Sequence, residues 1–160
     1  MHLVLIGRIR EDLSELQRIA DRIQLAWERA SQTGDDFYID GTALNLHSFY
    51  TGFEVIFELI ATSFDESKLK GKNWHQELPR QMAAEIPMVR AAVISTESRK
   101  SLDEYRGFRH VVRNVYAFNL DPDRMEHLVK DLPVVFERLH SEIVQFLQGI
   151  EAANNDQNNE

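Results

Sequence analysis

The chain has 160 residues, the length of one ordinary domain, and 43% of them are hydrophobic, which is enough to form a packed core. Its formal net charge of −8 argues against a general nucleic-acid coating protein, although a local cationic site depends on a patch and not on the total. The absence of cysteine excludes disulfides, thiolate metal sites and cysteine nucleophiles, and it fits a cytoplasmic protein.

The first predicted helix runs from Ile9 to Ala30, because apolar residues recur there at steps of three and four and form one stripe. It can also begin earlier, and Gly34 is its expected terminator. A second helix is predicted from Thr42, taken as its N-cap, to Phe64. Its apolar residues occupy more than one side, which indicates a central position in a bundle or a dimer interface.

The middle of the chain is less regular. The segment Asp65–Asn73 is polar and predicts a loop, and Trp74–Glu85 predicts a shorter helix that is kinked or starts late because of Pro79. From Met88 to Phe118 the pattern is again helical, with an interruption near Ser95–Ser98. A long helix containing a break is therefore expected in this part of the chain.

The last predicted helix starts at Asp121, its N-cap, and runs to about Glu151 with a bend at Pro133. No strand pattern is sustained and no segment is apolar and long enough to span a membrane. These elements predict an all-α, up-and-down bundle of four long helices and one short helix. We expect a single domain over residues 1–151 and a disordered polar tail over residues 152–160.

The segment 105–119, with the sequence YRGFRHVVRNVYAFN, carries the most distinctive pattern of polar residues. On a helix its arginines and a tyrosine share one face, because they lie three, four and three residues apart. Two further polar residues lie beside that row, four residues apart. The members of the row are Arg106, Arg109, Arg113 and Tyr116, and the two neighbours are His110 and Asn114.

Arginine suits phosphate binding, because its planar fork carries several donors. The alternative interpretation of the row is a solvated face whose arginines form ion pairs with neighbouring helices. Glu54 and Glu58 interrupt the apolar second helix, and they either face water or pair with a cation such as Arg109 or Arg113. The spacing alone leaves both interpretations open.

The motif resembles that of the HepT-like toxins of the HEPN ribonuclease superfamily, whose hallmark is Arg-x4–6-His followed by x-Tyr. Here Arg109 is followed, after four intervening residues, by Asn114, one further residue and Tyr116. The segments Ile9–Leu13 and Trp74–Leu78 also look similar to that family, so the likeness spans most of the chain. Asn114 stands where the family has histidine, and asparagine forms hydrogen bonds but does not exchange protons near neutral pH.

The resemblance implies a metal-independent endoribonuclease that needs no cofactor and cleaves RNA, including tRNA, through attack by the 2′-hydroxyl in a cleft between two protomers. Arg109 would then stabilise the charge that develops on the phosphorus oxygens. His110, one turn before the position of the family's histidine, would handle protons. Tyr116 would orient the phosphate or the motif helix, and Arg106 and Arg113 would widen the phosphate-binding surface.

The same resemblance implies the partners. The protein would be a homodimer and the toxin of a type VII-like toxin–antitoxin pair, neutralised by a nucleotidyltransferase antitoxin that attaches AMP to Tyr116. The added phosphate would block the cleft by its bulk and by charge repulsion. A membrane partner is not expected.

Two other functions stay open on the residues themselves. Because of Asn114, the chain can be a catalytically silent HEPN-like bundle that binds a nucleotide or a partner protein. It can also be a helical adaptor with no role in nucleic-acid chemistry. No metal site is predicted, because the six histidines are scattered without the ligand spacing of a bundle metal site.

Overall fold

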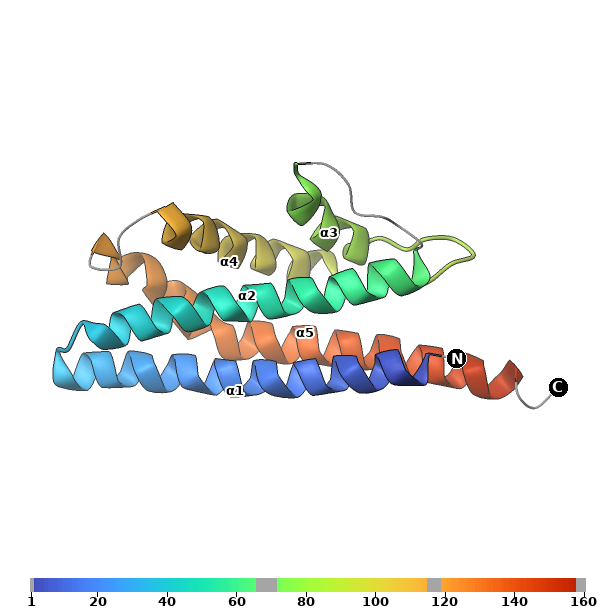
Figure 1. Ribbon diagram of the computed structural model, residues 1–160, viewed down its shortest axis with the longest axis horizontal. Helices are drawn as coiled ribbons and strands as arrows, with labels where there is room; N and C mark the ends of the chain where they lie inside the picture. The colour runs from blue at the N-terminus through green and yellow to red at the C-terminus, as the bar shows by residue number, and fades with distance from the viewer. Residues whose placement is uncertain (1, 66–71, 115–118, 158–160) are drawn as a thin grey trace.

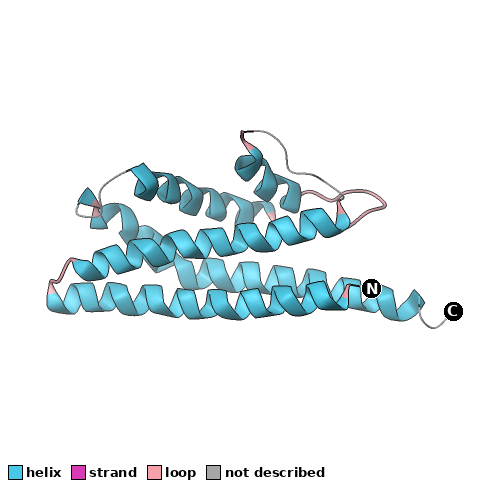
Figure 2. Ribbon diagram, viewed as in Figure 1, coloured by secondary structure: helices cyan, strands magenta, loops and turns pink. Residues whose placement is uncertain are grey.

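The computed structural model describes residues 2–65, 72–114 and 119–157, and within these ranges it is built from helices without any strand (Figures 1 and 2). The helices are α1 (Leu3–Thr33), α2 (Phe37–Phe64), α3 (Trp74–Ala83), α4 (Thr96–Asn114) and α5 (Pro122–Gln157). Followed in order, α1, α2, α4 and α5 alternate in direction, and the short α3 is inserted beside α2 and α4 (Figure 1). The predicted all-α, up-and-down bundle is confirmed.

Helix α1 packs through a single stripe of buried residues, as its period predicted; they are Ile6, Ile9, Leu13, Leu16, Ala20 and Ile23. It ends at Gly34, which adopts a left-handed φ of 67° and donates its N–H to the Ala30 carbonyl over 3.0 Å. Glycine suits this position because it lacks the Cβ that makes a positive φ costly. The predicted terminator is therefore confirmed.

Helix α2 is central, since it contacts α1, α3 and α4. It begins at Phe37, so the prediction of Thr42 as N-cap is wrong. Thr42 is buried inside the helix, and its hydroxyl donates to the Tyr38 carbonyl over 2.7 Å. A threonine can satisfy its hydroxyl in this way within a helix, so the residue type alone does not mark the helix start.

The expected helix from Met88 starts later than predicted, because residues 84–95 form an irregular connection and α4 begins at Thr96. The connection turns at Met88, which has a positive φ of 64°, and it is closed by a hydrogen bond of 2.9 Å from the Ile86 N–H to the Arg90 carbonyl. Ser95 then caps α4 by accepting the Ser98 N–H over 3.1 Å. The predicted break near residues 95–98 thus corresponds to the N-terminus of α4.

Helix α5 accommodates Pro133 with help from α1. Proline has no N–H to donate to the carbonyl four residues earlier, which belongs to Val129. That carbonyl instead accepts a hydrogen bond of 2.8 Å from the Gln24 side-chain amide of α1. The carbonyl that Pro133 leaves without its helical donor is therefore satisfied by a side chain of α1, and this hydrogen bond links the first and last helices.

The ends of α5 agree only in part with the prediction. Asp121 caps the helix, since its carboxylate accepts the Asp123 N–H over 3.0 Å. At the other end α5 is helical as far as Gln157, where a disordered tail was expected from residue 152. The two alanines at 152 and 153 are strong helix formers, and extending an existing helix adds one hydrogen bond per residue. None of the described helices is apolar over a length that could cross a membrane.

Candidate functional site

A polar groove with a volume of about 700 Å³ lies between the C-terminal half of α4 and the start of α3. All of the predicted site residues line it except Tyr116, which lies outside the described residues. Its lining consists of Lys72, Asn73, Gln76, Arg106, Gly107, Arg109, His110, Arg113 and Asn114. Because α4 is helical here, the spacing of three and four residues does bring the arginines to one surface.

Arg109 is the best-held side chain of the groove. Its guanidinium forms an ion pair with Glu54 of α2, whose side chain is only 5% exposed, while the Arg109 side chain is 15% exposed. The guanidinium carbon also lies 5.6 Å from the centre of the Tyr50 ring, a cation–π contact. The contacts with α2 thus hold the Arg109 guanidinium in place, while the side chain still lines the groove.

The other groove arginines are held less firmly. Arg106 lies with its Nε 3.5 Å from a carboxylate oxygen of Asp103, one turn earlier on α4. Arg113 is exposed at the rim, and Lys72 adds a further cation at the start of α3. The groove therefore combines Arg109, which is partly buried and paired with Glu54, with the more exposed cations Arg113 and Lys72. Ion pairing with a neighbouring helix and exposure to a ligand thus both occur within the arginine row.

Asn114 bonds within its own helix. Its side-chain amide donates to the His110 carbonyl over 2.7 Å, and both residues are exposed. An amide in this position has no proton to exchange near neutral pH. His110, also in the groove lining, is the histidine of α4 and lies four residues before Asn114.

Two side chains of α2, Tyr50 and Glu54, contact Arg109 of α4, and sequence reasoning singled out only Glu54. His47, Tyr50 and Glu54 lie three and four residues apart, so they share one face of α2. Burial and the cationic Arg109 and Arg113 lower the pKa of His47, so its imidazole is neutral at pH 7. Burial, and then the nearby Glu54 carboxylate, raise the pKa of Tyr50, so its phenol stays protonated.

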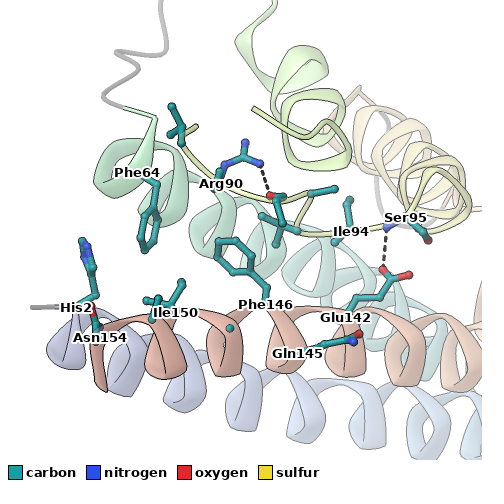
Figure 3. A pocket seen from close by; sticks show the side chains of 16 residues that line it. His2, Phe64, Arg90, Ile94, Ser95, Glu142, Gln145, Phe146, Ile150 and Asn154 are labelled. Atoms are coloured by element: carbon teal, nitrogen blue, oxygen red, sulfur yellow. Dashed lines mark hydrogen bonds between the residues drawn. The ribbon is translucent and has the colours of Figure 1, made fainter. Parts of the chain in front are cut away.

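A second cavity, of about 880 Å³, lies at the other end of α4 and has a different character (Figure 3). Phe64, Ile94, Phe146 and Ile150 give it a largely apolar wall, and its carboxylate, Glu142, accepts the Ser95 N–H over 3.2 Å. None of the predicted site residues lies there. For an anionic ligand the cationic groove is therefore the better site. Among the described residues no three acidic or histidine side chains gather as a metal site.

Comparison with protein-family models matched residues 41–150 to the family described as HepT-like protein. No curated protein and no solved structure gave a match. The matched range covers more than half of the chain and contains both the α2 face around Glu54 and the whole of the α4 groove. The chain therefore belongs to the HepT-like protein family, as the resemblance of its motif on α4 predicted.

Proposed function

We propose that this protein is a metal-independent endoribonuclease, the toxin of a toxin–antitoxin pair, and that it cleaves RNA in the groove between α3 and α4. The observation that carries the proposal is the placement of Arg109, which is fixed by Glu54 and Tyr50 and lines a groove with other cations. A guanidinium held in advance of the reaction stabilises developing negative charge without having to reorganise. RNA supplies the phosphate that such a groove binds.

The proposed reaction needs only groups of the RNA and of this chain. The 2′-oxygen attacks the adjacent phosphorus, the bond from phosphorus to the 5′-oxygen breaks, and the products carry a 2′,3′-cyclic phosphate and a 5′-hydroxyl. Arg109 binds the non-bridging oxygens, on which charge builds up, and Arg106 and Arg113 bind neighbouring phosphates. His110 exchanges a proton with the reacting oxygens.

A second copy of the chain and an antitoxin complete the proposal. A homodimer in the cytoplasm would bring two motif helices to one cleft and double the local positive charge of an otherwise acidic protein. A nucleotidyltransferase antitoxin would attach AMP to Tyr116, close in sequence to Arg113. The added phosphate would then occupy the cationic groove and repel RNA.

The test is RNA cleavage in the presence of EDTA. We expect the purified protein to cut unfractionated tRNA or a labelled RNA oligonucleotide, and to leave the all-deoxy oligonucleotide of the same sequence intact, because that substrate lacks the 2′-hydroxyl.

Arg113→Ala should lower kcat/KM about tenfold, since one charge-assisted hydrogen bond contributes about 1.5–3 kcal/mol and the site is exposed. Arg124→Ala, on an exposed arginine with a 70% exposed side chain, is the matched control. Cutting of the deoxy strand, or equal cutting by wild type and Arg113→Ala, would count against the proposal.

The alternative function is a catalytically silent bundle that binds a nucleotide or a partner protein, and it is favoured by the Asn114 amide bonded along its own helix. Replacing Asn114 by histidine discriminates between the two. If the natural chain is an enzyme, wild type cleaves RNA and Asn114→His changes the rate by a modest factor. Cleavage that appears only in Asn114→His would identify the natural chain as a binder.

A further inference from the structure

The groove between α3 and α4 has two walls of different chemistry. The α4 wall carries the arginines and His110, whereas the start of α3 contributes two uncharged amides, Asn73 and Gln76. Arginine binds the phosphates of any nucleic acid alike, while an amide presents a hydrogen-bond donor and an acceptor side by side. The α3 wall is therefore suited to bind a part of the ligand other than its phosphate.

The fold does not use these two amides in the part of the chain that the structure describes. Asn73 is the N-cap residue of α3, where an asparagine side chain usually accepts a backbone N–H, yet it makes no such bond. The Asn73 backbone carbonyl accepts the Gln76 N–H over 3.0 Å, and both side chains are exposed. Both amides are thus available to a ligand, unlike Asn114, whose amide already donates to the His110 carbonyl.

Helix α3 is held firmly, so its amides keep their position opposite the arginines. Leu78 and Met82 are fully buried, and the Gln81 side chain donates to Asp65 at the end of α2 over 2.6 Å. The groove between the two walls has a volume of about 700 Å³, which lies in the usual range of ligand sites, about 300–1,000 Å³. It can therefore hold a phosphate at one wall and the attached nucleoside at the other.

We propose that Gln76 and Asn73 bind the edge of an unpaired base while the α4 arginines bind the adjacent phosphate, so that the α3 wall selects the sequence that is cut. This inference rests on the proposed function. The base must be unpaired, because a paired base uses its Watson–Crick edge and the deep, narrow major groove of an RNA helix hides its other edge. The substrate class is therefore RNA with single-stranded loops or ends, and not duplex RNA.

The first test measures binding by strands that the protein is not expected to cut. Short oligo(dA), oligo(dC) and oligo(dU) carry bases and phosphates without the 2′-hydroxyl, and an abasic strand of the same length keeps only the phosphates. We expect the wild type to bind one of the three homopolymers at least about fivefold more tightly than the others, which is the low end for an amide that reads a base edge.

Three variants then separate base binding from phosphate binding. Gln76→Ala and Asn73→Ala/Gln76→Ala should remove the preference among homopolymers and leave binding of the abasic strand unchanged. Arg113→Ala should weaken binding of every strand, the abasic one included, by a similar factor. Gln32→Ala, at an exposed glutamine of α1 that is bonded to Glu28, is the matched control and should change neither quantity. Urea unfolding identifies any variant whose loss comes from misfolding.

The second test examines the same contact in cleavage. On an RNA that the wild type cuts at a few sites, Gln76→Ala should even out the relative rates among sites, whereas Arg113→Ala should slow all of them alike. Equal binding of the three homopolymers by the wild type, or a preference that survives in Asn73→Ala/Gln76→Ala, overturns the inference alone. A preference that depends on Gln76 in a wild type that cuts no RNA overturns the proposed function and keeps the base contact.

Discussion

Replacing Glu54 by alanine is expected to destabilise the protein by about 3–5 kcal/mol, because it leaves a largely buried guanidinium without its carboxylate. The Glu54 side chain is 5% exposed and the Arg109 side chain 15% exposed, so water cannot fully replace the lost partner. The Tyr50 ring beneath Arg109 cannot compensate, since a cation–π contact contributes less than an ion pair. The measurement is urea unfolding of wild type and Glu54→Ala followed by far-ultraviolet circular dichroism.

Two control variants test whether the loss of stability in Glu54→Ala arises from the unpaired charge of Arg109. The double variant Glu54→Leu/Arg109→Met removes both charges and should regain most of the lost stability, because an apolar pair of similar volume can replace a buried ion pair. Glu15→Ala breaks the exposed Arg18–Glu15 pair, with an N–O distance of 3.2 Å, and should change stability by less than about 0.5 kcal/mol. A double variant as unstable as Glu54→Ala would contradict this explanation.

The same ion pair links stability to the proposed chemistry. Glu54 is a positioning residue, because it acts on the substrate only through the Arg109 guanidinium that it holds. Glu54→Gln keeps a hydrogen-bond acceptor and most of the volume but loses the charge, so the fold should survive while Arg109 becomes less well placed. If Arg109 acts mainly in the transition state, kcat should fall and KM should change little.

Much of the fold could be predicted because its causes are local in sequence. The apolar stripe of α1 and the turn at Gly34 each depend on residues within one helix, and both are found where expected. The connection over residues 84–95 could not be predicted, since it is held by contacts between residues far apart. Arginine is usually a surface residue, yet the side chain of Arg90 is only 2% exposed and forms an ion pair with Asp65, 25 positions earlier.

The residues of the site also fall into a group that could be predicted from local sequence and a group that could not. The arginine row of α4 depends only on helical spacing, so the sequence was sufficient to place Arg106, Arg109 and Arg113 together. The contributions of α2 and α3 depend on which helix faces lie against α4, which spacing within one helix cannot specify. Glu54 was noticeable as an acid in an apolar helix, whereas Gln76 carried no such signal.

Replacing Arg90 by methionine should cost about 3–5 kcal/mol and should also weaken RNA binding at a distance. The guanidinium contacts Asp65 at 2.6 and 2.8 Å and donates to the carbonyls of Gln81, Ala84 and Ala91 at 3.0 Å each. Methionine leaves the Asp65 charge buried and removes the donor from these three carbonyls. Arg90→Lys should fail as well, because an ammonium group cannot reproduce the planar fork.

The expected effect on RNA binding follows from the position of the hydrogen-bond network around Arg90. Asp65 ends α2 and also accepts a hydrogen bond of 2.6 Å from the Gln81 side chain of α3, so Arg90 ties α3 to the end of α2. The other end of α3 supplies Gln76 to the groove opposite the arginines.

We therefore expect Arg90→Met to weaken the binding of a short RNA severalfold in filter binding at temperatures where the variant is still folded. Arg18→Met, on an exposed arginine with no role in this network, should leave both stability and binding unchanged. Loss of stability in Arg90→Met with unchanged RNA binding would show that α3 keeps its place without Arg90.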